Sequence, residues 1–340
     1  MTLTTNGGNN MRSNQADKGL IQYEAGQDFV DMQQMTDSGD HTEFSITDTP
    51  WSNKSGFEPV IRPDGLLTGG VISASTSNDK IAITDLTCYI GGELVSVTSI
   101  AEQDVDRSDE YTPGETYIIN SVTVTSGGAI AILQGNEGAS FSSTRGADGG
   151  PPLIPTTSIE IGWVRLSSTT PAVVTASEIL QVPGTSTEKS AFPNFDIDYT
   201  NGKVTFIDAL PLVHTGSVPK GVYCEVYTPI FANLDPASDF VPAVNSHSQG
   251  STQVYNGTIG SVSSSLNQAS FTVYLLDGIT DNIIGLADET IWVKWFPNRF
   301  RSPYSLTNGK LAISVSNSPT DNIQGSCTLT PTQKTENFEE

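Results

Sequence analysis

Short runs of alternating apolar and polar residues recur from residue 70 onwards, and many of them flank a Gly-Gly or Asn-Gly pair. Residues 80–97 alternate around Gly91-Gly92, and residues 117–133 alternate around Gly127-Gly128. A glycine pair tolerates the positive φ angles of a tight turn, so each of these segments predicts a β-hairpin.

The second half of the chain repeats this pattern around two Asn-Gly pairs. Asn201-Gly202 separates two alternating runs and predicts a hairpin, and Asn308-Gly309 predicts a turn that leads into a strand. Further strands are expected at residues 158–166, 222–231, 270–276, 291–296 and 311–316. The fold class predicted by this pattern is all-β.

Two segments interrupt the strands. Residues 175–180 form the best candidate for a short helix, because Thr175 can cap it and Glu178 follows three residues later. Residues 135–155 form a long loop that contains Arg145 and a Gly-Gly-Pro-Pro run. Loops of this length inside a β domain usually have a function or are disordered.

The chain divides by composition into three parts. Residues 1–60 are polar, with isolated large rings such as Trp51 and Phe57, and predict an extended N-terminal arm that single rings tether to pockets on its own body or on a neighbour. Residues 61–190 and 191–340 are expected to form a first and a second β-rich unit. Phe-Pro-Asn followed by Thr-Asn-Gly-Lys occurs in the second unit at both 192–203 and 296–310. This echo indicates duplicated units, although Asn-Gly hairpins also recur in unrelated β proteins.

Composition and charge exclude several classes of protein. The 340 residues include 16 Lys and Arg against 38 Asp and Glu, for a net charge of −22, which disfavours a nucleic-acid reader because duplex binding needs clustered cations. No apolar run approaches the roughly 20 residues of a membrane span, so no membrane insertion is expected. The widely spaced Cys88, Cys224 and Cys327 fit free thiols better than disulfides or a metal site. Without a recognisable signal peptide, we expect synthesis in a cytoplasm.

Motifs for catalysis are scarce. The three histidines lie in separate segments, and the chain has no zinc-protease, hydrolase, phosphate-loop or dinucleotide motif, so we expect no enzyme activity, no cofactor and no metal. The densest group of acidic residues comprises Asp104, Asp106, Asp109 and Glu110. A solvated acidic face is the simpler interpretation, and a carboxylate pair of a glycosidase is the alternative.

The strand predicted at residues 291–296 carries large side chains on both faces. Ile291, Val293 and Trp295 share one face, and Trp292, Lys294 and Phe296 share the other. A strand covered on both sides indicates a contact between subunits, so Trp292, Trp295 and Phe296 are candidate contact residues.

Residues 61–70, 145–166 and 291–316 resemble the major tail tube proteins of long, non-contractile-tailed bacteriophages. The resemblance implies a β-sandwich or barrel with a short flanking helix and long loops, and rings that stack into a hollow tube. It also implies that the loop 135–155, with Arg145, and the arm 1–60, with Trp51 and Phe57, contact neighbouring rings. One unit in this family is often about half as long as this chain, so a ring would contain three duplicated chains or six chains.

The resemblance implies a structural virion protein of the phage tail that is made in the bacterial host cytoplasm and conducts DNA during ejection. Its partners would be other copies of itself and other tail proteins, and DNA would pass without specific binding. Asp104, Asp106, Asp109 and Glu110 would then face the lumen, where negative charge keeps DNA mobile. Two other functions stay open, a tail-tip, baseplate or fibre protein that contacts the host and a carbohydrate-active enzyme.

Overall fold

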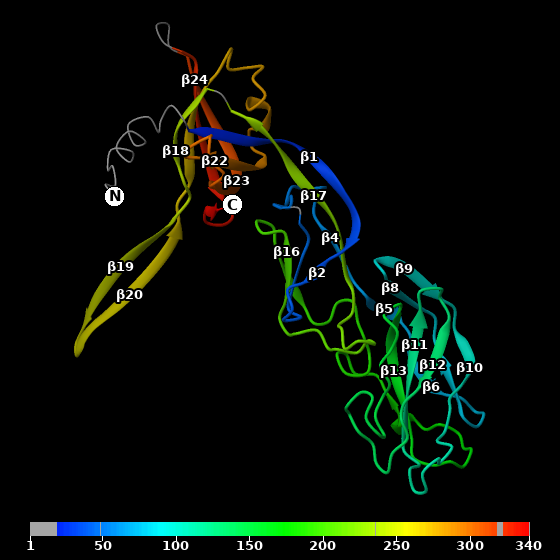
Figure 1. Ribbon diagram of the computed structural model, residues 1–340. Helices are drawn as coiled ribbons and strands as arrows, with labels where there is room; N and C mark the ends of the chain where they lie inside the picture. The colour runs from blue at the N-terminus through cyan, green and yellow to red at the C-terminus, as the bar shows by residue number, and fades with distance from the viewer. Residues whose placement is uncertain (1–18, 48, 235, 318–321, 340) are drawn as a thin grey trace, which may run out of the picture. The chain divides into compact units, whose positions relative to one another are not determined.

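The computed structural model describes residues 19–47, 49–234, 236–317 and 322–339 (Figure 1). Within these residues the regular elements are β-strands and two short 3-10 helices, which confirms the all-β class. The chain forms two compact units. Unit 1 comprises Met1–Asp28, Pro50–Glu58 and Tyr227–Glu340, and unit 2 comprises Phe29–Thr49 and Pro59–Val226.

Unit 1 contains most of a nine-stranded sheet. The strands follow the order β18 (Ala237–Val241), β21 (Ala269–Tyr274), β24 (Gln324–Pro331), β23 (Tyr304–Ser316), β22 (Thr290–Phe296), β1 (Leu20–Gln34), β17 (Val222–Asn233) and β4 (Val60–Pro63), with β25 (Glu336–Phe338) paired to β23. Alternate side chains on the inner strands are buried, including Phe271, Ile291 and Leu329. The period of two therefore builds one core against this sheet.

Strands β1 and β17 each have residues in both units. The division falls between Asp28 and Phe29 in β1 and between Val226 and Tyr227 in β17, whereas the sequence predicted a boundary at residues 190/191. Leu20–Tyr23 pair with Val293–Phe296 of β22, so this part of the expected arm is a strand of the sheet. Few apolar side chains of β1 are buried, which is why the alternation did not reveal it.

Unit 2 contains four smaller sheets. Their strand orders are β5 (Gly65–Gly69), β8 (Leu86–Ile90), β9 (Glu93–Val97); β10 (Ile100–Asp104), β7 (Lys80–Ile83), β6 (Ile72–Ala74); β12 (Ile130–Gln134), β11 (Ile118–Thr125), β13 (Ser158–Leu166), β14 (Ile179–Leu180); and β15 (Phe195–Asp198), β16 (Lys203–Phe206), β3 (Glu43–Ser45), β2 (Thr36–Asp37). The main core of unit 2 joins the first three sheets, with Ile81, Cys88 and Val164 among its fully buried side chains.

The local turn signals are confirmed at three places. Gly91-Gly92 connects β8 to β9, Gly127-Gly128 connects β11 to β12, and Asn201-Gly202 connects β15 to β16. The short helix expected at residues 175–180 is only a 3-10 turn, η1 (Ala176–Glu178). Its predicted capping pair is present, since the Thr175 N–H donates to the Glu178 carboxylate at 2.7 Å.

The turn predicted at Asn308-Gly309 is wrong. Both residues lie inside β23, where Gly309 pairs with Ile291 on one side and Pro331 on the other. A Cβ at position 309 would lie 2.7 Å from the Thr330 carbonyl oxygen. Glycine therefore allows β23 and β24 to approach each other closely at this position. Because Asn201-Gly202 is a turn, the two halves of the echo occupy different structures and do not support duplication.

Candidate functional site

The predicted acidic residues lie on the surface of unit 2. Asp104 ends β10, is 80% exposed and lies 3.5 Å from the Lys80 ammonium. Asp106, Asp109 and Glu110 are exposed in the following loop. The Glu110 carboxylate accepts the Gly114 N–H at 2.8 Å, which tightens this loop. The exposure of these four residues fits a solvated acidic face. That they face the lumen of a tube stays a prediction.

Two of the predicted subunit-contact residues are core residues of unit 1. The side chains of Trp51 and Trp292 are 0% and 1% exposed. No surface of either ring is left for a neighbouring subunit, so the contact expected for them does not fit the structure. The Trp292 backbone N–H donates to the Glu24 carboxylate at 3.0 Å, whereas its indole Nε1–H donates to no protein atom within the described residues. Large side chains on both faces of β22 reflect burial inside its own unit.

The other predicted aromatic contacts are half-buried. Phe57 packs edge-on against Tyr227, with ring centroids 5.0 Å apart. Trp295 stacks on Phe240 at 5.2 Å, and Phe296 contacts Tyr304 at 5.3 Å. Each ring keeps some exposed surface, so a role in subunit contact stays a prediction for these three residues.

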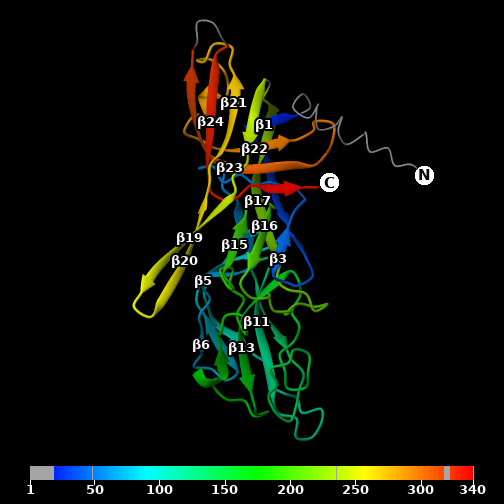
Figure 2. The same cartoon turned by 90° about the vertical axis from the view of Figure 1, so that its left-hand side faces the viewer.

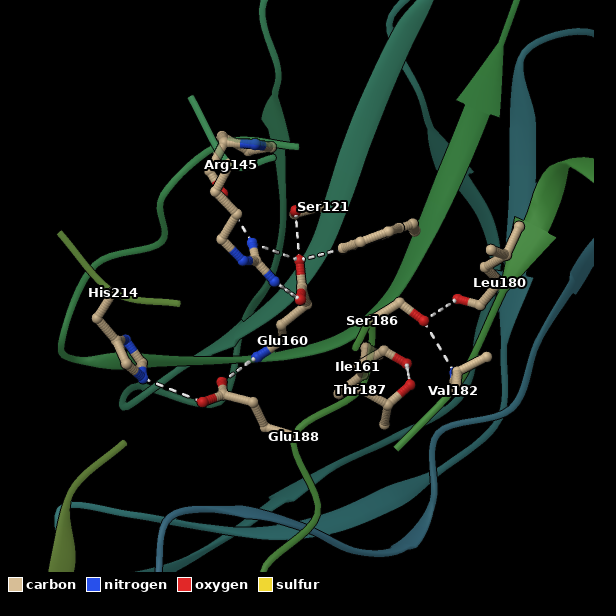
Figure 3. A network of polar contacts seen from close by, with 12 residues as sticks. Ser121, Arg145, Glu160, Ile161, Leu180, Val182, Ser186, Thr187, Glu188 and His214 are labelled. Carbon is tan, nitrogen blue, oxygen red and sulfur yellow. Dashed lines mark hydrogen bonds and ion pairs between the residues drawn. The ribbon is translucent and has the colours of Figure 1, made fainter. Parts of the chain in front are cut away.

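Arg145 reaches into a buried polar network of unit 2 (Figure 3). Its guanidinium forms an ion pair with Glu160, whose side chain is 1% exposed, and also donates to the Pro152 carbonyl at 2.8 Å. Ser121 and Trp163 donate to the same carboxylate, Trp163 at 2.7 Å. Three residues therefore donate to one buried carboxylate, Arg145 through two of its nitrogens, and Arg145 fastens the loop 135–155 to β13 inside the subunit.

Glu188 and His214 continue this network (Figure 3). One Glu188 oxygen accepts the Glu160 backbone N–H at 2.8 Å, and the other lies 3.1 Å from the His214 Nε2. The His214 Nδ1 lies 3.1 Å from the Pro155 carbonyl oxygen. Two loops, around Glu188 and around His214, are thus held to the end of the long loop and to β13.

A hollow of about 510 Å³ lies beside the network, and Asp64, His214 and Lys220 line it. The Lys220 ammonium donates to the carbonyls of Lys189 and Phe192 at 2.6 and 2.9 Å, so its hydrogens are directed at backbone. The group contains three buried carboxyls, Asp64, Glu160 and Glu188, together with the side chains of Arg145, Lys220 and His214. This balance is typical of a buried group that fixes loops.

Burial shifts the pKa values of these groups. Burial raises the pKa of Asp64 to about 7, although the Gly92 and Gly91 N–H groups act to lower it. Burial also raises the pKa of Glu160 to about 7, although Arg145 acts to lower it. Burial lowers the pKa of Lys220 to about 8. Burial alone would lower the pKa of His214, but Glu188 raises it overall.

The shift at Asp64 links stability to pH. Its folded pKa lies above the unfolded value, so the folded state binds the proton more tightly. The stabilisation by this group is complete below about pH 4 and is lost as the pH rises through about 7.

The sequence did not indicate this network, because its members lie far apart along the chain. One signal was present. Glu160 stands between Ile159 and Ile161 in a mainly apolar run that forms a strand buried on both faces, and a charge in that position needs a buried partner. In the described part of the chain, no group of three or more acidic, histidine or cysteine side chains is arranged to hold a metal ion.

A second element of interest is the β19–β20 ribbon, formed by β19 (Asn245–Val254) and β20 (Gly257–Leu266) of unit 1. Ten residue pairs join the two strands, and within the described residues neither strand pairs with another. Figures 1 and 2 show the ribbon extending away from the other strands of unit 1. Tyr255, in its two-residue turn, is fully exposed. An isolated two-stranded ribbon is marginally stable in water.

No protein-family model and no curated protein matches this chain. Among the described residues, no helix combines the length and the apolar character needed to cross a membrane.

Proposed function

We propose that the chain is a structural subunit that assembles with copies of itself, as a tail tube protein of a long, non-contractile-tailed phage. Its partners are identical chains and other tail proteins, and its place is the virion. Its contribution is a wall of strands around a bore through which DNA passes during ejection. The proposed rings contain six chains, or three if each chain provides two ring positions.

The β19–β20 ribbon is the observation that carries this proposal. Its side chains from Ser263 to Ser265 and at Asn245, His247 and Ser248 are exposed. Main-chain pairing across a ribbon whose sequence contains few apolar residues does not offset the chain entropy lost when 20 residues are ordered. A neighbouring subunit that covers the ribbon supplies the missing buried surface.

Two further features support self-assembly. The nine-stranded sheet ends at β18, whose outer edge pairs with no strand among the described residues. Exposed edges are generally blocked or paired with another chain. The net charge of −22 suits a bore that must not retain DNA, since an anionic wall leaves phosphates hydrated and mobile.

Shortening the ribbon tests the proposal. Ser246 and Ser265 face each other, and their hydroxyls lie 2.9 Å apart, so replacing residues 247–264 with Asn-Gly closes a short hairpin at that point. We expect a folded chain with an unchanged melting temperature that no longer forms oligomers in light scattering and electron microscopy. Oligomers equal to those of the wild type would contradict the role of the ribbon.

Point substitutions provide the matched control. Tyr255→Ser removes the exposed ring at the ribbon turn, and Tyr111→Ser removes a ring that is 86% exposed in unit 2. We expect weaker assembly only for Tyr255→Ser. Slender trimers of the wild-type chain would instead favour a fibre or tail-tip protein, and shortening of host polysaccharide would favour the enzyme.

A further inference from the structure

Unit 1 contains a recess of about 410 Å³ that is lined by residues of β1, β18 and β22. Ile21, Leu234, Ala237, Phe240, Trp295 and Pro297 contribute most of its apolar lining. Ser238 and Asp239 add polar groups to the lining, and Asp239 is exposed. The backbone of Gly19 also lines it, and its carbonyl accepts a hydrogen bond from the exposed Arg299 at 2.8 Å. The recess therefore combines apolar side chains with polar groups, and Arg299 and Asp239 lie at its margin.

The same unit presents an apolar loop after β21, residues 275–281. Leu276 and Ile279 are 93% and 80% exposed. Asp281 accepts the N–H groups of Leu276 and Gly278 at 2.9 and 2.8 Å, and Asp277 accepts that of Ile279 at 2.7 Å. These bonds hold the loop in one conformation while two aliphatic side chains face solvent.

A loop ordered in advance loses little conformational entropy when it binds. Hydrogen bonds from Thr280 lower the pKa of Asp277 to about 2, so its carboxylate is charged at neutral pH. The loop thus offers two aliphatic side chains flanked by negative charge. Its chemical complement is a recess with apolar side chains in its lining and a cation at the rim. The recess of unit 1 has both, with Arg299 beside Gly19, and Asp239 is the acidic residue of its lining.

We propose that Leu276 and Ile279 of one copy insert into this recess of a second copy, with Asp277 and Asp281 directed toward Arg299. Loop and recess are different surfaces of one chain, so each copy can give its loop to one neighbour and receive a loop from another. Such a head-to-tail contact generates rings or filaments. The inference rests on the proposed self-assembly and names one contact that produces it.

Disulfide trapping tests the contact between separate chains. Ile279→Cys in one chain and Ala237→Cys in another place the two thiols on opposite sides of the proposed contact. The native Cys88, Cys224 and Cys327 are free and buried, so they contribute little background. Mixing the two variants should give a covalent heterodimer, whereas Tyr111→Cys mixed with Ala237→Cys should not. Equal yields in the two mixtures would overturn the proposal.

Self-association provides the second measurement. Burial of aliphatic side chains stabilises a contact, so Leu276→Ser with Ile279→Ser should weaken association of the full chain by more than about tenfold. Unchanged association would overturn the contact and leave the proposed function standing. A wild-type chain that never associates would contradict both. Stronger association after deletion of residues 1–18 would show that this segment occupies the recess, which also overturns the proposal.

Discussion

Substitution of Arg145 by methionine should destabilise unit 2 strongly. The change removes both guanidinium bonds to Glu160, whose carboxylate is almost inaccessible to solvent. Breaking a buried ion pair on one side generally costs 3–5 kcal/mol. Ser121 and Trp163 still donate to the carboxylate, and Arg145 is itself slightly exposed, so we expect the lower end of that range. Loss of the cation–π contact with Trp163 adds about 0.5–1 kcal/mol.

The loss should depend on pH. Without the guanidinium, the pKa of Glu160 rises further above its ordinary range, because the group that opposed the effect of burial is gone. At low pH, protonation then neutralises the buried Glu160 carboxyl, which no longer has a cation beside it. The destabilisation should therefore be about 3–4 kcal/mol near about pH 8.5 and clearly smaller near about pH 6. The double variant with Glu160→Gln should recover most of the loss at the higher pH.

Urea denaturation of the chain measures this loss, and hydrogen exchange locates it. The amides of Gly146 and Gly149 donate to Pro151 and Asn136, so they should exchange faster when the loop 135–155 is released. Arg165→Met is the matched control, because the Arg165 guanidinium contacts the Phe141 ring and no ion pair of it is found in the described residues. A loss below about 1 kcal/mol, or one that is the same at both pH values, would refute this account of the network.

Three further predictions concern other parts of the chain. Gly309→Ala should destabilise unit 1 by more than about 1 kcal/mol, whereas Gly285→Ala, whose new Cβ meets no atom within 4 Å, should be nearly neutral; equal shifts in thermal melts would contradict the close approach of β23 to β24. The stability of the wild type should fall between about pH 4 and pH 7 by up to about 4 kcal/mol more than that of Asp64→Asn, in denaturant titrations across that range. Parallel curves would show that Asp64 is not the group responsible. Replacing Asp104, Asp106 and Asp109 by lysine should slow DNA exit from particles that contain the variant, and unchanged ejection kinetics would place these residues away from the bore.

The local part of the fold was predictable from the sequence, and the non-local part was not. Gly91-Gly92 and Asn201-Gly202 form turns because the backbone angles of a tight turn depend on the two residues themselves. Asn308-Gly309 has the same composition as Asn201-Gly202 but lies mid-strand, because the neighbouring β24 requires a residue without a side chain. Short-range composition cannot distinguish these two uses of glycine.

The buried network shows the same limit. Arg145, Glu160, Glu188 and His214 come together only when three loops fold against β13, and their spacing along the chain matches no known motif. The resemblance to tail tube proteins implied that Arg145 contacts a neighbouring ring, but its guanidinium is directed inward, to the buried Glu160 carboxylate. The exposed acidic residues were easier to place, since charged side chains without apolar neighbours generally stay in solvent.

The most direct test of self-assembly is the mass and the shape of the purified full chain across a range of concentrations. Light scattering should give multiples of 36.1 kDa in threes or sixes, and electron microscopy of the same samples should show rings or tubes with an open bore. A single species of 36.1 kDa at every concentration, with no annular particles, would contradict the proposed function.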